Sequence, residues 1–243
     1  MKKLICLIMF FVLIASCSSD KDTKVELPDN NIEKTNNLVN QPKNNINESL
    51  IIEESDSEDI VIDSSQPIIG GPDKIEVTEF FYYGCIHCMT FEPYINEWKK
   101  DMPDNVRFER IPALWNPLLN LHGQMFFTKE ILTENGKLKD PEGFRARIFR
   151  EWHNRKNYMA SEDAIKEIFL EFGVSEDDFN KTFKSFQVAQ KLNLARDLAR
   201  RYGISSTPTM VVNGKYRTGA GEAGSYPKLM RVIDELIERE SIR

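Results

Sequence analysis

Cysteine and histidine are scarce in this chain, which has four cysteines and three histidines among 243 residues. Two of the cysteines lie within the first 17 residues, so only Cys85 and Cys88 can form a local pair. A structural zinc site normally takes four nitrogen or sulfur ligands. His122 and His153 stand alone on predicted helices. We therefore expect no metal site, and we expect these two histidines to be surface or packing residues.

The apolar run at the N-terminus, Leu4 to Ala15, is too short to cross a membrane. Its twelve residues would rise about 18 Å as a helix, whereas the hydrocarbon core of a bilayer is roughly 30 Å thick. Lys2 and Lys3 precede the run, and small residues follow it. This arrangement is typical of a cleaved secretory signal. We therefore predict a signal peptide over residues 1–16.

The end of this run, Ile14-Ala15-Ser16-Cys17, resembles a bacterial lipobox. In such a motif the cysteine is acylated and becomes the first mature residue, so Cys17 is the predicted lipidation site. Several acyl chains anchor a protein stably, where a single chain binds only marginally. Ordinary secretion, with cleavage near this point, is the alternative. Ser18 favours the outer membrane only under the sorting rule of enteric bacteria, so the choice between inner and outer membrane stays open.

Aromatic residues are absent between positions 18 and 66, where Asn, Ser, Asp, Glu and Lys dominate. A segment of this composition cannot bury a core. We therefore predict a lipid-anchored, disordered tether over residues 17–66, with an end-to-end distance of about 40 Å. Ile60, Val61 and Ile62 could add a short strand or a docking patch. Because such a triplet in a polar tail usually has no structure, we expect none here.

A basic stripe is also lacking. The chain has a net charge of −6, and its excess of acidic residues falls between positions 18 and 71, while acids and bases balance from Pro72 onward. Proteins that bind nucleic acid usually carry a patch of Lys and Arg that neutralises phosphates. The sequence therefore predicts no nucleic-acid partner.

The pattern from residue 67 onward indicates an α/β fold in two halves. Residues 75–83 form a continuous β-branched and aromatic run, typical of a strand buried on both faces. A helix is predicted from Cys85 to about Lys100, kinked at Pro93 because the apolar spacing continues beyond it. A second strand follows at 106–111. The order of strand, helix and strand predicts a parallel βαβ unit in residues 67–115.

Residues 116–185 then change to a purely helical pattern, with Ser161 and Ser175 as N-caps and Gly173 as a helix end. Residues 186–243 return to the sheet. They predict a long helix, a strand at 209–212, a hairpin turn at Asn213-Gly214 and a final helix over 226–240. The expected architecture is a mixed sheet interrupted by an all-helical insertion.

The pair in Cys85-Ile86-His87-Cys88 has the spacing of a redox centre. Side chains at i and i+3 share one face of a helix, within reach of a disulfide. At the first turn, unpaired backbone N–H groups and the helix dipole stabilise an anion, so Cys85 should be a thiolate of low pKa. His87 adds a positive charge when protonated, and Cys88 should be the more buried, resolving thiol. A zinc half-site or an inert disulfide is the alternative.

The strings EFFYYGCIHC and STPTMVVNGKY, on either side of a helical insertion, resemble the DsbA family of thiol:disulfide oxidoreductases, here in a lipoprotein form. The resemblance covers roughly residues 74–240. It implies a thioredoxin-like fold with an inserted all-helical domain, a periplasmic location, and no cofactor beyond a redox-active disulfide between Cys85 and Cys88.

Three residues carry further roles over from the family. Pro208 matches its cis-proline, which with the preceding Thr207 pairs with a substrate peptide; a trans proline in a turn is the alternative. Glu79 matches a partly buried acid thought to assist proton transfer, although it could simply be a charged residue at a strand end. Glu92 matches another acid near the helix kink.

Two positions depart from the family pattern. Ile86 stands where the family's best-known pair has proline, and Thr207 stands where valine is familiar. Both positions tune thiolate stability in the family. The oxidising strength of this chain is therefore left open by its sequence, and Ile86 and Glu92 are treated as modulators.

The leading hypothesis is a monomeric oxidase that donates disulfides to unfolded exported proteins with free cysteines and is re-oxidised by a DsbB-type membrane partner. A reductase or isomerase of the same fold is the second. Isomerases of this kind usually carry an N-terminal dimerisation domain, where this chain has the polar segment 18–66. A third possibility is a module that only binds exported chains, against which the retained cysteines and His87 argue.

Overall fold

The computed structural model describes residues 60–61 and 69–242. The predicted signal peptide, the lipidation site Cys17 and nearly all of the predicted tether lie outside the described residues. Among the residues it does describe, no helix is both long and apolar enough to cross a membrane.

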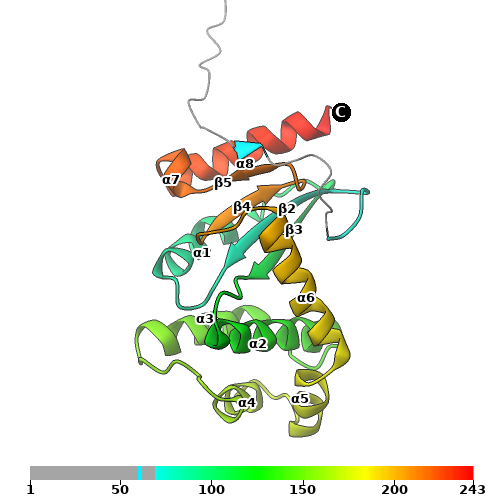
Figure 1. Cartoon of the computed structure of the whole chain (residues 1–243), viewed down its shortest axis with the longest axis vertical. Coiled ribbons are helices and arrows are strands. Elements are labelled where there is room, and N and C mark those ends of the chain that lie inside the picture. Colours follow the sequence, from blue (N-terminus) through cyan, green and yellow to red (C-terminus); the bar gives the residue numbers. More distant parts are fainter. Residues whose placement is uncertain (1–59, 62–68, 243) are drawn as a thin grey trace, which may run out of the picture. The chain divides into compact units, whose positions relative to one another are not determined.

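A five-stranded mixed sheet forms the centre of the fold (Figure 1), in the order β1-β5-β4-β2-β3. Strand β2 runs parallel to β3 and antiparallel to β4, and β4 and β5 form the predicted hairpin around Asn213 and Gly214, both with positive φ. The strands are β1 (Ile60–Val61), β2 (Ile75–Phe81), β3 (Val106–Pro112), β4 (Thr209–Val212) and β5 (Tyr216–Thr218). As its sequence predicts, β2 is buried along its whole length.

The expectation that Ile60–Ile62 has no structure was wrong for its first two residues. Strand β1 pairs antiparallel with β5, with Ile60 opposite Arg217 and Val61 opposite Tyr216. An uncovered β5 would leave a row of unpaired backbone groups at the sheet edge, and β1 satisfies them. The partner strand lies far away in the sequence, so local composition could not reveal this pairing.

Four helices belong to the thioredoxin-like part: α1 (Ile86–Trp98), α6 (Phe186–Arg201), α7 (Ala220–Ala223) and α8 (Tyr226–Ser241). Four more form the insertion between β3 and α6: α2 (Pro117–Glu134), α3 (Pro141–His153), α4 (Glu162–Glu171) and α5 (Glu176–Phe183). Figure 1 shows the insertion helices gathered at one end of the sheet, with α6 leading back to it. The predicted fold class is confirmed; among the helices, α7 had not been expected, and α2 and α3 had been predicted only as part of a helical stretch.

Local sequence signals explain most helix boundaries. The side chains of Ser161 and Ser175 accept hydrogen bonds from backbone N–H groups in the first turns of α4 and α5, as predicted. Gly173 adopts the positive φ that ends α4. Helix α1 continues through Pro93 to Trp98. These signals place Cys85 immediately before the first residue of α1.

Candidate active site

Cys85 is the N-cap residue of α1, and its sulfur accepts a hydrogen bond of 3.4 Å from the backbone N–H of Cys88. Both cysteines are free thiols in the structure. Cys85 is 7% exposed and Cys88 is fully buried, which agrees with the predicted attacking and resolving positions. Just before Cys85, the absence of a side chain at Gly84 lets the ring of Trp152 pack against the backbone, because a Cβ there would lie 2.5 Å from that ring.

The surroundings of Cys85 favour its thiolate. The pKa of Cys85 is lowered to about 5, first by a hydrogen bond from the thiol of Cys88, and then by the Thr207 side chain and the backbone N–H groups of Cys88 and His87. Burial opposes this shift without cancelling it. The unpaired N–H groups at the start of a helix therefore act on Cys85 in the expected direction.

The surroundings of Cys88 shift its pKa in the opposite direction. Burial raises the pKa of Cys88, and its hydrogen bond to Cys85 and the nearby charge of Glu79 raise it further. The two sulfurs therefore differ strongly in acidity: Cys85 is the anionic member of the reduced pair, and Cys88 keeps its proton.

The loop before β4 lies against Cys85. The Thr207–Pro208 peptide bond is cis, as the family resemblance implies. The Cys85 thiol donates to the backbone carbonyl of Thr207 at 3.3 Å. Thr207 therefore contacts the reacting sulfur through its main chain and, through its side chain, lowers the pKa of Cys85.

His87 is exposed, and its ring points toward the hydroxyl of Tyr226. That hydroxyl lies 3.5 Å from Nδ1 and donates to the His87 carbonyl at 3.2 Å. Within the described residues, the imidazole makes no hydrogen bond to Cys85. His87 therefore acts on Cys85 through its backbone N–H, and the expected contribution of its ring stays a prediction.

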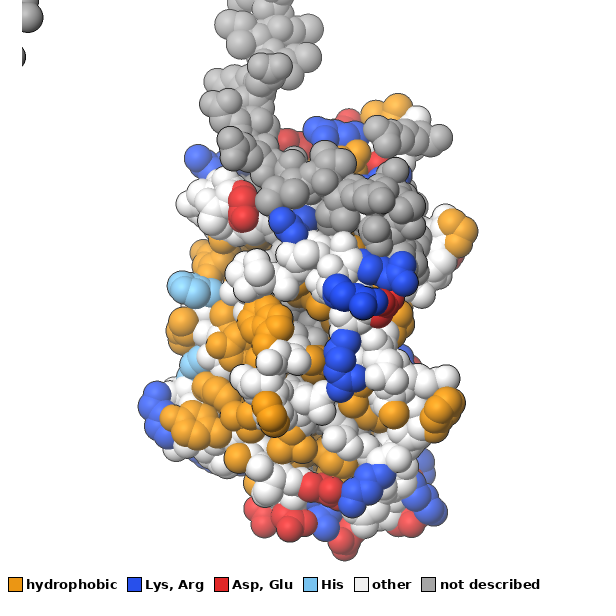
Figure 2. All heavy atoms as spheres, viewed as in Figure 1, with side chains coloured by type: hydrophobic (Ala, Val, Ile, Leu, Met, Phe, Trp, Pro, Cys, Tyr) orange, Lys and Arg blue, Asp and Glu red, His pale blue; other side chains and the backbone are white. Residues whose placement is uncertain are grey.

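Apolar side chains, some exposed and some half-buried, lie near the redox pair. Ile86 is 48% exposed beside Cys85. The rings of Tyr82 and Trp115 pack edge to face, as do those of Trp152 and Tyr158. Figure 2 shows hydrophobic side chains gathered across the middle of one face, between the sheet and the insertion helices. The aromatic residues had not been singled out from the sequence, because they come from separate segments with no shared spacing.

Behind the cysteines, two acids and two arginines form a buried cluster. Glu79 of β2 is fully buried and accepts from Arg110 of β3 at 2.7 Å. Glu92 of α1 pairs with Arg110 at 3.3 Å and with Arg145 of α3 at 2.5 Å. Arg145 also lies 3.8 Å from Glu79, and its guanidinium sits 4.2 Å from the ring centre of Phe81.

The two acids of this cluster shift in opposite directions. Burial raises the pKa of Glu79, although Arg110 and Arg145 oppose the shift. Burial would also raise the pKa of Glu92, but the hydrogen bond and charge of Arg145, with the charge of Arg110, lower it overall. Glu79 is therefore the acid of the cluster that is more readily protonated, and Glu92 the one that is more readily ionised. Neither arginine had been predicted from the sequence, because their spacing carries no motif.

The rings of the two other histidines contact backbone carbonyl groups. His122 is buried, with Nε2 2.9 Å from the carbonyl of Tyr158. Nε2 of His153 lies 3.0 Å from the carbonyl of Tyr83, two residues before Cys85. Both are packing residues of the insertion, one of the two roles expected for them. Among the described residues, no three potential metal ligands cluster together.

Comparisons with known proteins agree with this geometry. The sequence model of a family described as a DSBA-like thioredoxin domain matches residues 132–226. The chain is 41% identical over 172 residues to the thiol:disulfide interchange protein DsbA of Azotobacter vinelandii, covering 71% of this chain and 78% of that protein. It is 37% identical to the protein of the same name from Pseudomonas syringae pv. tomato, covering 77% and 84%.

Solved structures give the same result. The crystal structure of Pseudomonas aeruginosa DsbA superimposes with a TM-score of 0.68 at 36% identity, covering 76% of this chain and 93% of that one. DsbA from Xylella fastidiosa superimposes with a TM-score of 0.67 at 25% identity, covering 76% and 96%. With its reactive thiolate, its resolving thiol and its cis-proline loop in place, the chain belongs to the DsbA family of thioredoxin-fold oxidoreductases, which introduce disulfide bonds into proteins.

Proposed function

We propose that this protein works in the periplasm, where it passes the Cys85–Cys88 disulfide to unfolded exported proteins with free cysteines. The observation that carries the proposal is the opposed acidity of the two sulfurs, with the pKa of Cys85 lowered to about 5 and that of Cys88 raised. A stabilised thiolate favours the reduced form of the enzyme, so its disulfide is readily given away. No cofactor beyond this disulfide is required.

The reaction consists of two thiol–disulfide exchanges. A client thiolate attacks the Cys85 sulfur; the Cys85–Cys88 bond breaks, and Cys88 leaves with the electron pair and takes up a proton. A second client thiolate then attacks the client sulfur of the mixed disulfide and releases Cys85 as a thiolate. The client loses two electrons and two protons. The enzyme gains both electrons and keeps one proton on Cys88, and the other proton goes to solvent.

The surrounding residues have separate roles in this scheme. Glu79 supplies or removes the proton at Cys88, which its burial and its electrostatic influence on Cys88 support. Thr207 and Pro208 offer backbone groups to the client beside the mixed disulfide. Ile86 and Glu92 modulate the reactivity of Cys85, the first from the solvent side and the second through the buried cluster.

The remaining parts of the proposal rest on the sequence and the family. A lipid at Cys17 holds the chain to a membrane as a lipoprotein, after removal of the signal peptide at residues 1–16. A DsbB-type membrane protein restores the disulfide by accepting two electrons. The protein acts as a monomer. A reductase or isomerase of the same fold is the alternative, which the reduction potential of the pair distinguishes.

A trapping experiment tests the proposal. In the full-length protein, Cys88→Ala removes the resolving thiol, so client proteins should accumulate as mixed disulfides with Cys85, visible as reducible adducts on non-reducing gels. The double variant with Cys85→Ala is the matched control and should give no adducts. The absence of adducts from the single variant would show that Cys85 does not exchange with exported proteins.

A further inference from the structure

Strand β3 is an open edge of the sheet as far as the described residues show. At the opposite edge β1 covers β5, whereas β3 pairs only with β2 within the described chain. An uncovered edge strand presents a row of backbone donors and acceptors to which another extended chain can bind.

The ladder shows which backbone groups of β3 are free. The bonds from the Ile75 N–H to the Asn105 carbonyl, 2.9 Å, and from the Ala113 N–H to the Phe81 carbonyl, 2.8 Å, fix its phase. In a parallel ladder alternate residues face the partner strand. The N–H and C=O groups of Phe108 and Arg110 therefore point outward. Within the described chain, no hydrogen bond reaches them.

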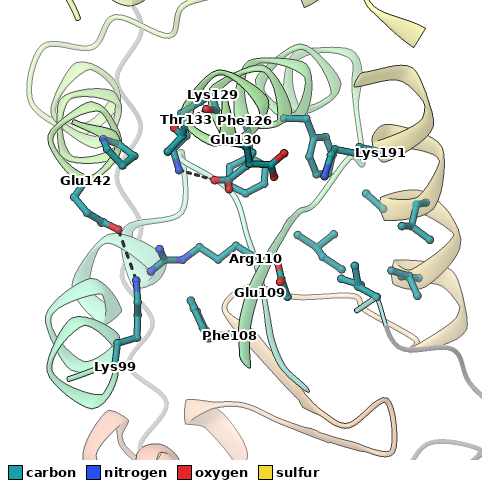
Figure 3. Close-up of a pocket in the computed structure, with 18 residues that line it drawn as sticks. Lys99, Phe108, Glu109, Arg110, Phe126, Lys129, Glu130, Thr133, Glu142 and Lys191 are labelled. Carbon is teal, nitrogen blue, oxygen red and sulfur yellow. Dashed lines mark hydrogen bonds and ion pairs between the residues drawn. The ribbon is translucent and has the colours of Figure 1, made fainter. Parts of the chain in front are cut away.

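A hollow opens along this edge. A cavity of about 270 Å³ is lined by four consecutive residues, Phe108 to Ile111, by Lys99 just after α1, and by residues of α2, α3 and α6. Figure 3 looks into it: Arg110 extends toward the α1 side of the strand, and Lys99 and Lys191 come from opposite walls. We call this cavity the β3 groove. Because consecutive strand residues line it, it gives access to both faces of the edge and to the free backbone groups.

The walls of the β3 groove combine apolar surface with charges of both signs. Leu194 provides an exposed apolar side chain, whereas the lining residues Ile111 and Leu198 are almost wholly buried. Glu109 and Lys191 have no hydrogen-bond or ion-pair partner among the described residues, and burial raises the pKa of Glu109. A mixed surface of this kind suits a polypeptide with varied side chains rather than one small ligand.

We propose that the β3 groove binds a short extended segment of an unfolded client by adding it as a strand to β3. The proposal rests on the proposed function, which supplies unfolded chains whose backbone groups lack partners. A peptide main chain offers the donors and acceptors that Phe108 and Arg110 lack within the described chain, and apolar client side chains fit against the exposed Leu194. This second contact would hold a client while its thiols exchange at Cys85, which raises their effective concentration.

Two other occupants are disfavoured. Residues 60 and 61 of this chain already pair with β5 at the opposite edge of the sheet, so they are not the strand added to β3. A second copy, paired symmetrically about Glu109, would set two like charges opposite each other. A client segment meets neither obstacle.

Amide hydrogen exchange tests the proposal on the wild-type protein. The probe is reduced and carboxymethylated lysozyme, a permanently unfolded chain without free thiols, so binding is measured apart from redox chemistry. The amides of Phe108 and Arg110 should exchange faster than that of Glu109 in the free protein and should slow at least tenfold when the probe saturates. Slowing confined to residues around Cys85 and Thr207 would overturn the proposal. Slowing that rises with protein concentration, without the probe, would identify a second copy as the occupant and overturn it too.

Two matched leucines provide the control. Leu194 of the groove is 43% exposed, and Leu170 of α4, outside the groove, is 41% exposed. Leu194→Glu should weaken probe binding at least tenfold, whereas Leu170→Glu should leave it within twofold of wild type. Equal affinities for both variants would refute the groove as the binding site. The Cys88→Ala trap is read separately, so failure here and failure of the proposed function are distinguishable.

Discussion

Arg145 of the helical insertion forms a two-point ion pair with Glu92 of the redox helix, with nitrogen–oxygen distances of 2.5 and 2.8 Å. The same guanidinium lies 3.8 Å from the buried Glu79. The insertion therefore contributes half of the positive charge in the cluster behind the cysteines, and it is electrostatically part of the site.

Replacing Arg145 should destabilise the protein. Arg145→Met keeps much of the side-chain volume but leaves two buried acids with one arginine, which should cost about 3–5 kcal/mol of unfolding free energy. Arg155→Met is the control. Its guanidinium pairs with Glu151 from a side chain that is 63% exposed, so its loss should cost about 1 kcal/mol or less. Urea denaturation measures the unfolding free energy of both variants. Equal losses would show that the buried ion pair stabilises the fold no more than the exposed one.

Much of this fold follows from local sequence signals. The continuous run at β2, the turn at Asn213-Gly214 and the serine caps of α4 and α5 each depend on neighbouring residues, and each was predicted. Strand β1 and Arg145 depend on partners brought close only by the folded chain. The sequence also gives no signal for the four-residue helix α7, because its N-cap residue Gly219 has no side chain to make a capping hydrogen bond.

The residues of the site also divide into those found from the sequence and those found only in the folded structure. Spacing identified Cys85 and Cys88, and family resemblance supplied Pro208 and Glu79. The charges that balance Glu79 come from β3 and α3, and the paired aromatic rings of Tyr82 and Trp115 come from two further segments. No spacing rule links such residues, so only the three-dimensional structure could find them.

The side chain of Thr207 should help to set the acidity of Cys85. Thr207→Val removes its hydroxyl but keeps the shape and the backbone carbonyl, so the pKa of Cys85 should rise above its value of about 5. Thiolate absorbance at 240 nm, followed against pH in the reduced protein, measures the change. An unchanged pKa of Cys85 would show that the Thr207 hydroxyl does not stabilise the thiolate.

His87→Ala should also raise the pKa of Cys85, because it deletes a neighbour that is positive when protonated. The effect should be smaller than that of Thr207→Val, since the backbone N–H of His87 remains and the ring is exposed. The same absorbance titration compares the two variants. A larger shift from His87→Ala would mean that the imidazole, and not the main chain, is the principal influence.

Stability should depend on pH differently in the two redox forms. The pKa of Cys85 is lowered from an ordinary value of 9.0 to about 5 in the folded dithiol form. A lowered pKa stabilises the folded state fully above the ordinary value, and this contribution is lost as pH falls through the folded value. The disulfide form has no such thiolate. The difference in Tm, reduced minus oxidised, should therefore grow from about pH 5 to about pH 9, measured by thermal unfolding of both forms. A difference that stays constant over this range would contradict the assigned thiolate.

The reduction potential of the Cys85–Cys88 pair, measured by equilibration with glutathione, tests the central claim most directly. A thiolate stabilised at Cys85 should make the pair a stronger oxidant than thioredoxin, with a potential well above about −270 mV. A value at or below that of thioredoxin would contradict the account, because the disulfide would then be kept rather than donated.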